Sequence, residues 1–217
     1  TDRGVDPEKI KVVTNGVLTD NFPARPRDAK LVEELGLEGK FVVGYLGTHG
    51  LAHKLDFILD CVPEAPANVH FLFIGGGARK DALLERVERE GYSNVSMLSP
   101  IPKAEIARYI SVTDLALVPL KKSDTFKTVI PSKIFENAAM RKPILLGVEG
   151  ESKAIIDKYG VGSAFEPENK TDFLEKLNKL TTDPVFYAGC QDNCTRLAAD
   201  YDRNVLASAM LAELKNI

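Results

Sequence analysis

The chain has 217 residues, 27% of them charged and 44% hydrophobic, with a formal net charge of −3 at pH 7. This length and composition fit a globular protein of one large domain or two small ones, and the charge argues against a nucleic-acid-binding surface. No apolar run is long enough to span a membrane, no signal peptide opens the chain, and three cysteines are a poor disulfide framework, so we expect a cytoplasmic protein.

Predicted strands and helices alternate along the chain. Short apolar runs predict strands at residues 9–13, 41–46, 69–74, 95–98, 115–119, 143–147 and 162–165. Helical periodicity with start and stop residues predicts helices at residues 28–35, 55–61, 79–90, 103–111, 132–142, 152–158, 171–180, 184–200 and 204–214. The alternation is typical of one α/β domain built on a Rossmann-like, doubly wound parallel sheet, with extra helices on its C-terminal side.

Loops rich in glycine or in charged residues follow most of the predicted strands. They cover residues 47–54, 75–77, 99–103, 121–136 and 147–152. In an open parallel sheet, ligands bind beside the carboxyl ends of the strands, and all these loops belong to that edge. Their side chains can therefore share one ligand.

The helix that begins near Pro131 is the centre of the predicted site. Its first turn carries Ser132, Lys133 and Glu136. Free N–H groups and the positive end of the dipole attract phosphate there, Lys133 adds charge, and the Glu136 carboxylate can accept hydrogen bonds from a diol such as ribose. By itself the stretch favours a plainer interpretation, in which Ser132 caps the helix and Glu136 complements its dipole by about 0.3–1 kcal/mol.

Two glycine-containing loops have similar double interpretations. The loop 47–54 carries His49, His53 and Lys54 before a helix and could wrap around a diphosphate. Its glycine spacing fits neither the dinucleotide-binding fingerprint nor the P-loop. The alternative is a flexible turn with surface histidines. Residues 75–77 are three glycines that either let a ligand approach the backbone or form a tight turn.

Cys190 and Cys194 are one turn apart on a predicted helix without a nearby histidine, so no metal site is expected.

Taken in order, these motifs resemble the family 4 glycosyltransferases. The motifs are Asn15-Gly16-Val17, the glycine loop at 47–54, the glycines at 75–77, and Pro131–Glu136 ahead of Lys142-Pro143. The chain looks like the C-terminal, nucleotide-sugar-binding domain of the two-domain GT-B architecture, matched over nearly all of residues 1–217. It looks most like bacterial enzymes that build surface polysaccharides, such as transferases of N-acetylfucosamine-type sugars. The opening Thr1-Asp2-Arg3 then suggests a cut inside a longer protein, with the N-terminal acceptor domain absent.

The resemblance implies a donor-binding site but no catalytic residue on this part of the chain. Glu136 matches the second glutamate of the family's E-x7-E motif, which holds the ribose hydroxyls, and the position of the first glutamate is Thr128. Ser132 and Lys133 would face the diphosphate. The loop containing Gly47 would cover the pyrophosphate, with Thr48 and His53 where the family usually has Arg and Lys. The full implied set is Gly47, Thr48, His49, His53, Lys54, Gly76, Ile101, Lys103, Thr128, Ser132, Lys133 and Glu136.

The implied activity is retaining transfer of a hexosyl or N-acetylhexosaminyl group from a UDP- or GDP-sugar to a glycan or lipid-linked acceptor. The resemblance implies no cofactor, no metal and no nucleic acid, and it allows the full-length protein to associate peripherally with the inner face of a membrane. The chain alone would bind the donor without turnover. Two alternatives stay open: half of a nucleotide-sugar 2-epimerase, and a non-catalytic nucleotide-binding module. The sequence upstream of Thr1 would separate the module from the enzymes.

Overall fold

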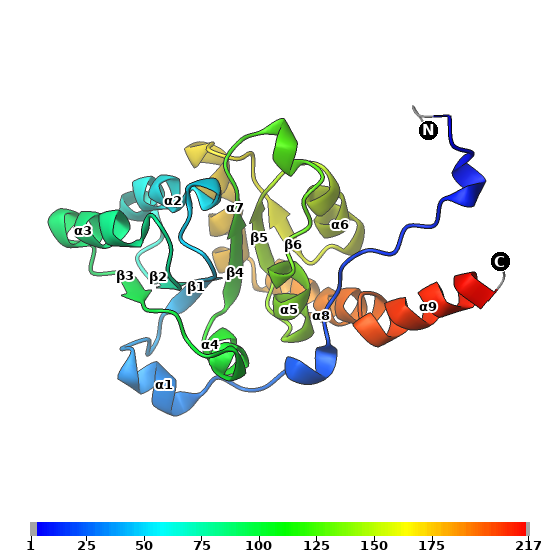
Figure 1. Cartoon of the computed structure of the whole chain (residues 1–217). Coiled ribbons are helices and arrows are strands. Elements are labelled where there is room, and N and C mark those ends of the chain that lie inside the picture. The colour runs from blue at the N-terminus through cyan, green and yellow to red at the C-terminus, as the bar shows by residue number, and fades with distance from the viewer. Residues whose placement is uncertain (1–3, 216–217) are drawn as a thin grey trace.

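The computed structural model describes residues 4–215, in which six parallel strands form one sheet with helices on both faces (Figure 1). The strands are β1 (Phe41–Leu46), β2 (Val69–Ile74), β3 (Val95–Leu98), β4 (Leu115–Pro119), β5 (Ile144–Gly147) and β6 (Gly162–Ala164). Their order in the sheet is β3-β2-β1-β4-β5-β6, and each neighbouring pair is parallel. Because the order reverses between β1 and β4, the carboxyl ends of these two strands flank the crevice where such sheets bind ligands.

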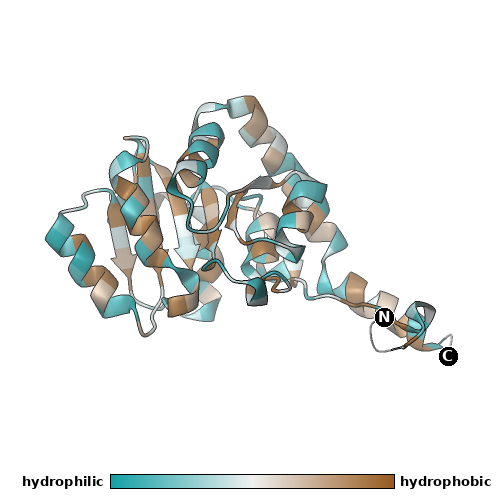
Figure 2. Cartoon of the chain, turned by 90° about the horizontal axis from the view of Figure 1, so that it is seen from above, coloured by the Kyte–Doolittle hydropathy of each residue, from teal (hydrophilic) through white to brown (hydrophobic). Residues whose placement is uncertain are grey.

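Helices cover the two faces of the sheet in two groups. One face packs against α1 (Ala29–Glu34), α4 (Ile106–Ser111), α5 (Lys133–Ala139) and α6 (Glu151–Tyr159). The other packs against α2 (Leu55–Cys61), α3 (Lys80–Glu90) and α7 (Lys170–Thr182). Helix α8 (Pro184–Asp200) contributes to both cores, and α9 (Arg203–Lys215) projects away from the sheet (Figures 1 and 2).

Alternation of side chains along the strands produces the two cores. Val43 and Tyr45 face the α2 and α3 side, whereas Val42 packs with Leu31 of α1 on the opposite side, and all four side chains are buried. Burial of each such large apolar side chain stabilises the fold by about 1.5–3 kcal/mol. This is why the central strands are apolar throughout, and it confirms the predicted fold class of a Rossmann-like, doubly wound sheet with extra C-terminal helices.

The predicted strand at residues 9–13 is wrong. Residues 10–16 are irregular, and the side chains of Val12 and Val13 are 80% and 44% exposed. This segment leads away from the body of the domain, so its apolar residues meet no sheet edge that could supply hydrogen bonds (Figure 1). The segment is fixed at its far end, where the Arg203 guanidinium donates to the Gly16 carbonyl at 2.9 Å and to Asn15 Oδ1 at 3.2 Å, beside the isolated bridge between Val17 and Asp202.

Several predicted helix ends are confirmed by their capping groups. Asp28 accepts a hydrogen bond from the Leu31 N–H at 2.9 Å and so begins α1, and Asp183 accepts one from the Phe186 N–H at 2.9 Å at the start of α8. The helix predicted at 103–111 starts with a 3₁₀ turn before α4. Within residues 4–215 no helix combines the length and apolar character that crossing a membrane requires.

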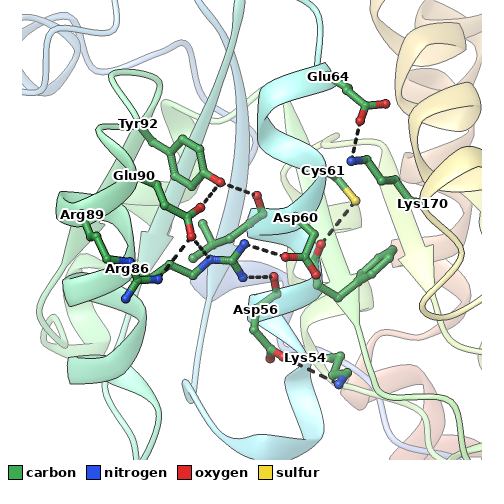
Figure 3. Close-up of polar contacts among 12 residues, drawn as sticks. Lys54, Asp56, Asp60, Cys61, Glu64, Arg86, Arg89, Glu90, Tyr92 and Lys170 are labelled. Atoms are coloured by element: carbon green, nitrogen blue, oxygen red, sulfur yellow. Dashed lines mark hydrogen bonds and ion pairs between the residues drawn. The ribbon is translucent and has the colours of Figure 1, made fainter.

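A polar network joins α2 to α3 on the outer surface (Figure 3). The Arg86 guanidinium donates to the Asp56 carbonyl at 2.9 Å and pairs with the Asp60 carboxylate at 2.5 Å and the Glu90 carboxylate at 2.9 Å. Tyr92 donates to Glu90 and to a carbonyl of α2. These bonds hold α3 in place, and α3 follows directly from the glycine loop after β2.

Candidate functional site

A pocket of about 730 Å³ opens at the carboxyl ends of β1 and β2, beside the switch point of the sheet. Its walls come from the two glycine loops, from α4 and from the first turns of α5. The lining residues are Leu46, Gly47, Thr48, His53, Ile74, Gly75, Gly76, Gly77, Pro100, Ile101, Ile106, Ile110, Ser132, Lys133, Glu136 and Asn137. Such a mostly apolar cavity with a few polar groups is typical of a small-molecule site.

The two glycine loops interlock at the floor of this pocket. The His49 N–H donates to the Gly76 carbonyl at 2.8 Å. Gly75 and Gly77 have φ of +148° and +145°, conformations that suit glycine alone. A Cβ on Gly75 would lie 1.9 Å from the Gly47 carbonyl oxygen, and one on Gly77 would lie 2.7 Å from the His49 carbonyl oxygen. The glycines are therefore needed for one loop to pass against the other.

Lys133 is the cation that the first turn of α5 contributes to the pocket. Its Nζ lies 4.0 Å from the centre of the Tyr45 ring, and a Cβ on Gly47 would lie 2.8 Å from it. No side chain or carbonyl within residues 4–215 forms a hydrogen bond or ion pair with this Nζ. Burial lowers the pKa of Lys133 to about 8, against a smaller opposing effect of the Glu136 carboxylate.

Of the two histidines of the loop after β1, His49 is buried and His53 is half-buried, so the surface-turn alternative does not hold. His53 lines the pocket, its ring 5.9 Å from that of Tyr45, and burial together with Lys133 lowers its pKa. His49 is completely buried, and burial, with smaller effects of Lys80, His53 and Lys133, lowers its pKa to about 4. Within the described chain, both ring nitrogens of His49 and Nδ1 of His53 have no hydrogen-bond partner.

Ser132 and Glu136 also lie on the pocket wall. The Ser132 side chain makes no capping hydrogen bond, so the capping interpretation of this residue is wrong. Glu136 follows one turn after Ser132, and it is the carboxylate among the lining residues. Next to it, the Asn137 side chain is fixed by donating to the Lys133 carbonyl at 2.8 Å. The first turns of α5 thus present a hydroxyl, an ammonium and a carboxylate to one cavity.

Eight of the twelve predicted donor-binding residues line the pocket, and His49, Lys54, Lys103 and Thr128 do not. His49 lies beneath the floor. Lys54 adopts the left-handed conformation at the start of α2, and its Nζ pairs with Asp56 at 3.6 Å and Glu168 at 3.4 Å (Figure 3 shows the first pair). Lys103 and Thr128 are exposed on turns.

Sequence reasoning missed most of the apolar wall. Ile106 and Ile110 enter the pocket from α4, together with Pro100 from the preceding loop. Ile106 and Ile110 are four residues apart on a helix that directly follows a loop at a strand end, and this spacing could have indicated that both face the site. Tyr45, whose ring supports Lys133, was also missed because it lies inside a predicted core strand.

A smaller pocket of about 230 Å³ adjoins the first and shares His53 and Lys133 with it. The rest of its lining has side chains of carbon only: Ala52, Val118, Pro119, Leu120, Phe126, Val129 and Pro131. The loop that carries the last three is anchored to α6, since the Ser152 hydroxyl donates to the Val129 carbonyl at 2.6 Å. His53 and Lys133 therefore stand between two cavities.

Comparisons with known proteins agree with this architecture. Residues 40–183 match the family described as "Glycosyl transferases group 1". TuaH of Bacillus subtilis (strain 168), whose name describes a teichuronic acid biosynthesis glycosyltransferase, is 30% identical over 178 residues, which cover 80% of this chain and 43% of TuaH. The chain spans less than half the length of the curated relatives it matches.

Solved structures with the same fold include two that bear on the site. HepE of Anabaena, solved in complex with UDP and glucose, has a TM-score of 0.82 and 20% identity, covering 100% of this chain and 59% of HepE. The C-terminal domain of the group 1 protein LpcC of Francisella tularensis has a TM-score of 0.68 and 17% identity, covering 85% of this chain and 97% of that domain.

Proposed function

Since the chain belongs to the group 1 family of glycosyl transferases, we propose that it is the donor-binding half of a retaining glycosyltransferase of polysaccharide biosynthesis. The enzyme transfers a hexosyl or N-acetylhexosaminyl group from a nucleoside-diphosphate sugar to a glycan or lipid-linked acceptor. The observation that carries the proposal is the pocket at the switch point of the sheet. There α5 presents to two interlocked glycine loops a carboxylate and an ammonium that has no ion-pair partner among residues 4–215.

Each wall of the pocket has a counterpart in such a donor. The diphosphate lies against Lys133 and the first turn of α5, and the glycines let the backbone approach it closely. The Glu136 carboxylate accepts hydrogen bonds from the ribose hydroxyls, and the apolar wall around Ile101 receives the base. Lys133 stabilises the charge that develops on the leaving diphosphate. The complex of HepE with UDP and glucose supports a nucleotide-sugar donor.

The donor sugar occupies the smaller pocket beyond His53 and Lys133. This arrangement puts the bond that breaks, between the sugar and the diphosphate, at the junction of the two cavities. A cation at that junction is nearest to the oxygen that leaves, where electrostatic stabilisation is most effective. Thr128, which is exposed, takes no part in holding the sugar in this arrangement.

A second domain supplies the acceptor in this proposal. The chain spans 43% of TuaH, and its structural match LpcC is a C-terminal domain. Helix α9 leaves Met210, Leu211 and Leu214 about half exposed on one side, which is the kind of apolar face that packs against another domain. The chain alone therefore binds the donor without turnover. The whole enzyme acts in the cytoplasm at the inner face of the membrane and needs no metal, so EDTA leaves its activity unchanged.

Calorimetric titration of the chain with UDP, GDP and their sugars tests the proposal. One of these ligands is expected to bind, and Glu136→Ala is expected to weaken binding about 10- to 100-fold, because hydrogen bonds to a charged group contribute about 1.5–3 kcal/mol. Glu85→Ala, on the exposed surface of α3, is the matched control and should bind as the wild type does. Absence of a binding heat with every one of these ligands at millimolar concentration would contradict the proposal.

The longer protein that contains this chain provides the test of reaction type. We expect it to transfer the sugar to an acceptor with retention of the anomeric configuration. Production of an epimerised free sugar in place of a transfer product would instead assign the pocket to an epimerase.

A further inference from the structure

The junction between the two pockets has positive charge without a matching anion. His53 comes from the loop after β1 and Lys133 from α5, and both line both cavities. Within residues 4–215, neither forms an ion pair with a carboxylate. Around His53, β1 presents Tyr45, the same loop presents His49, and α5 presents Lys133 and, one turn on, Glu136.

Protonation of His53 in the empty pocket is therefore unfavourable. The imidazole is partly removed from water, its Nδ1 has no hydrogen-bond partner in the described chain, and a lysine ammonium lies close to it. Both effects keep the pKa of His53 below its ordinary value, burial being the larger. At neutral pH the empty site thus carries the charge of Lys133 and a neutral His53.

We propose that the donor diphosphate binds together with one proton, which His53 takes up. The inference rests on the proposed function, because it needs a diphosphate at this junction. A diphosphate supplies the negative charge that the cluster lacks, so it stabilises the imidazolium that burial and Lys133 disfavour in the empty pocket. Departure of the nucleotide then releases the proton. An arginine at position 53 would be charged in both states and would take up none.

Proton uptake has a defined sign in the pH dependence of binding. Because the bound state holds the additional proton, the dissociation constant rises with pH, by up to about tenfold per pH unit above the pKa of the empty state and below that of the complex. Lys133, with a pKa of about 8, is mostly protonated in the empty pocket at pH 7 and below, so its own uptake is small there and grows as the pH rises toward 8. His49 stays neutral, since its pKa is about 4. Measurements between about pH 6 and pH 7 therefore report mainly on His53.

The experiment is calorimetric titration of the chain at pH 7 in buffers of different ionisation enthalpy. The probes are UDP-glucose and GDP-mannose, whose doubly esterified phosphates do not titrate near neutral pH. The wild type is expected to take up about half a proton or more per bound donor. His53→Arg should take up almost none, whatever its affinity for the donor. His70→Gln is the matched control, because His70 is a buried histidine of β2 that bonds Ser96 Oγ at 2.8 Å outside the pocket, and it should keep the wild-type uptake.

Each outcome bears on a separate claim. Binding without proton uptake in the wild type would overturn the inference and leave the proposed function intact. No binding of these probes, of UDP or GDP, or of their other sugars at millimolar concentration would overturn both. Nitrogen NMR of the three imidazoles in the wild type keeps the test decisive if a variant fails to fold. Only the His53 ring should become protonated when the donor is added; a bound state with neutral His53, or with the proton on His49, would refute the assignment.

Discussion

Substitution of Gly75 by alanine is expected to separate the two glycine loops that form the pocket floor. The new Cβ would lie 1.9 Å from the Gly47 carbonyl oxygen, and real Cβ contacts are no shorter than 3.0 Å, so the loops must move apart by about 1.1 Å. The φ of +148° adds backbone strain of about 1–3 kcal/mol for a residue with a side chain. Together these effects should lower the free energy of unfolding by about 3 kcal/mol.

The assay is thermal unfolding combined with calorimetric titration of UDP. For a domain of this size, about 3 kcal/mol corresponds to a decrease in Tm of about 6–12 °C. UDP affinity should fall at least about tenfold, because a displacement near 1 Å at a binding site is costly. Gly91→Ala is the matched control, since Gly91 also has positive φ, +67°, but a Cβ there would meet no atom within 4 Å.

The control separates backbone strain from the loss of loop packing. Gly91→Ala should cost about 1–2 kcal/mol of stability and leave UDP binding unchanged. If Gly75→Ala matched Gly91→Ala in both stability and affinity, the loops would not be interlocked in the way that the structure indicates.

Two further substitutions test the supports of the site. Lys142 is buried, and its Nζ donates to the Ser111 and Thr113 carbonyls at 3.1 and 2.7 Å. Lys142→Met should therefore lower the free energy of unfolding by about 2–3 kcal/mol at pH 7. The control Lys121→Met, at an exposed position, should not lower it. Burial lowers the pKa of Lys142 from 10.5 to about 8, so between these pH values the unfolded chain binds more protons than the folded one. In urea unfolding, the free energy of unfolding of the wild type should therefore rise with pH relative to that of Lys142→Met. A difference between the two that stays constant with pH would contradict this reasoning. Ser152→Ala removes the 2.6 Å hydrogen bond to the Val129 carbonyl and should lower the free energy of unfolding by about 1 kcal/mol. Amide hydrogen exchange in residues 124–131 should become faster. Exchange as slow as in the wild type would show that other contacts hold the loop.

The central strands could be predicted from the sequence because their environment leaves little choice. β1 and β2 are buried on both faces, which selects uninterrupted apolar runs bounded by turn residues. Residues 9–13 have a similar short apolar pattern but no sheet edge beside them. Pattern alone reports that a segment can form a strand, whereas pairing decides whether it does.

The candidate site could be predicted to the level of loops and less well to individual side chains. Ligands bind beside the carboxyl ends of parallel strands, and this rule correctly predicts that Gly47, Gly76 and Lys133 line one cavity although they are far apart in the sequence. It could not foresee that Lys54 turns away in a left-handed conformation to reach Glu168, or that His49 lies inside the floor. Within a loop, side-chain direction depends on local φ and ψ, which residue type determines only weakly.

A crystal structure of the chain with UDP-glucose would test the central claim most directly. The proposal predicts the diphosphate within hydrogen-bonding distance of Lys133 Nζ, the ribose hydroxyls on the Glu136 carboxylate and the glucose in the smaller pocket. A nucleotide bound elsewhere on the chain, or in this pocket with its ribose away from Glu136, would contradict it.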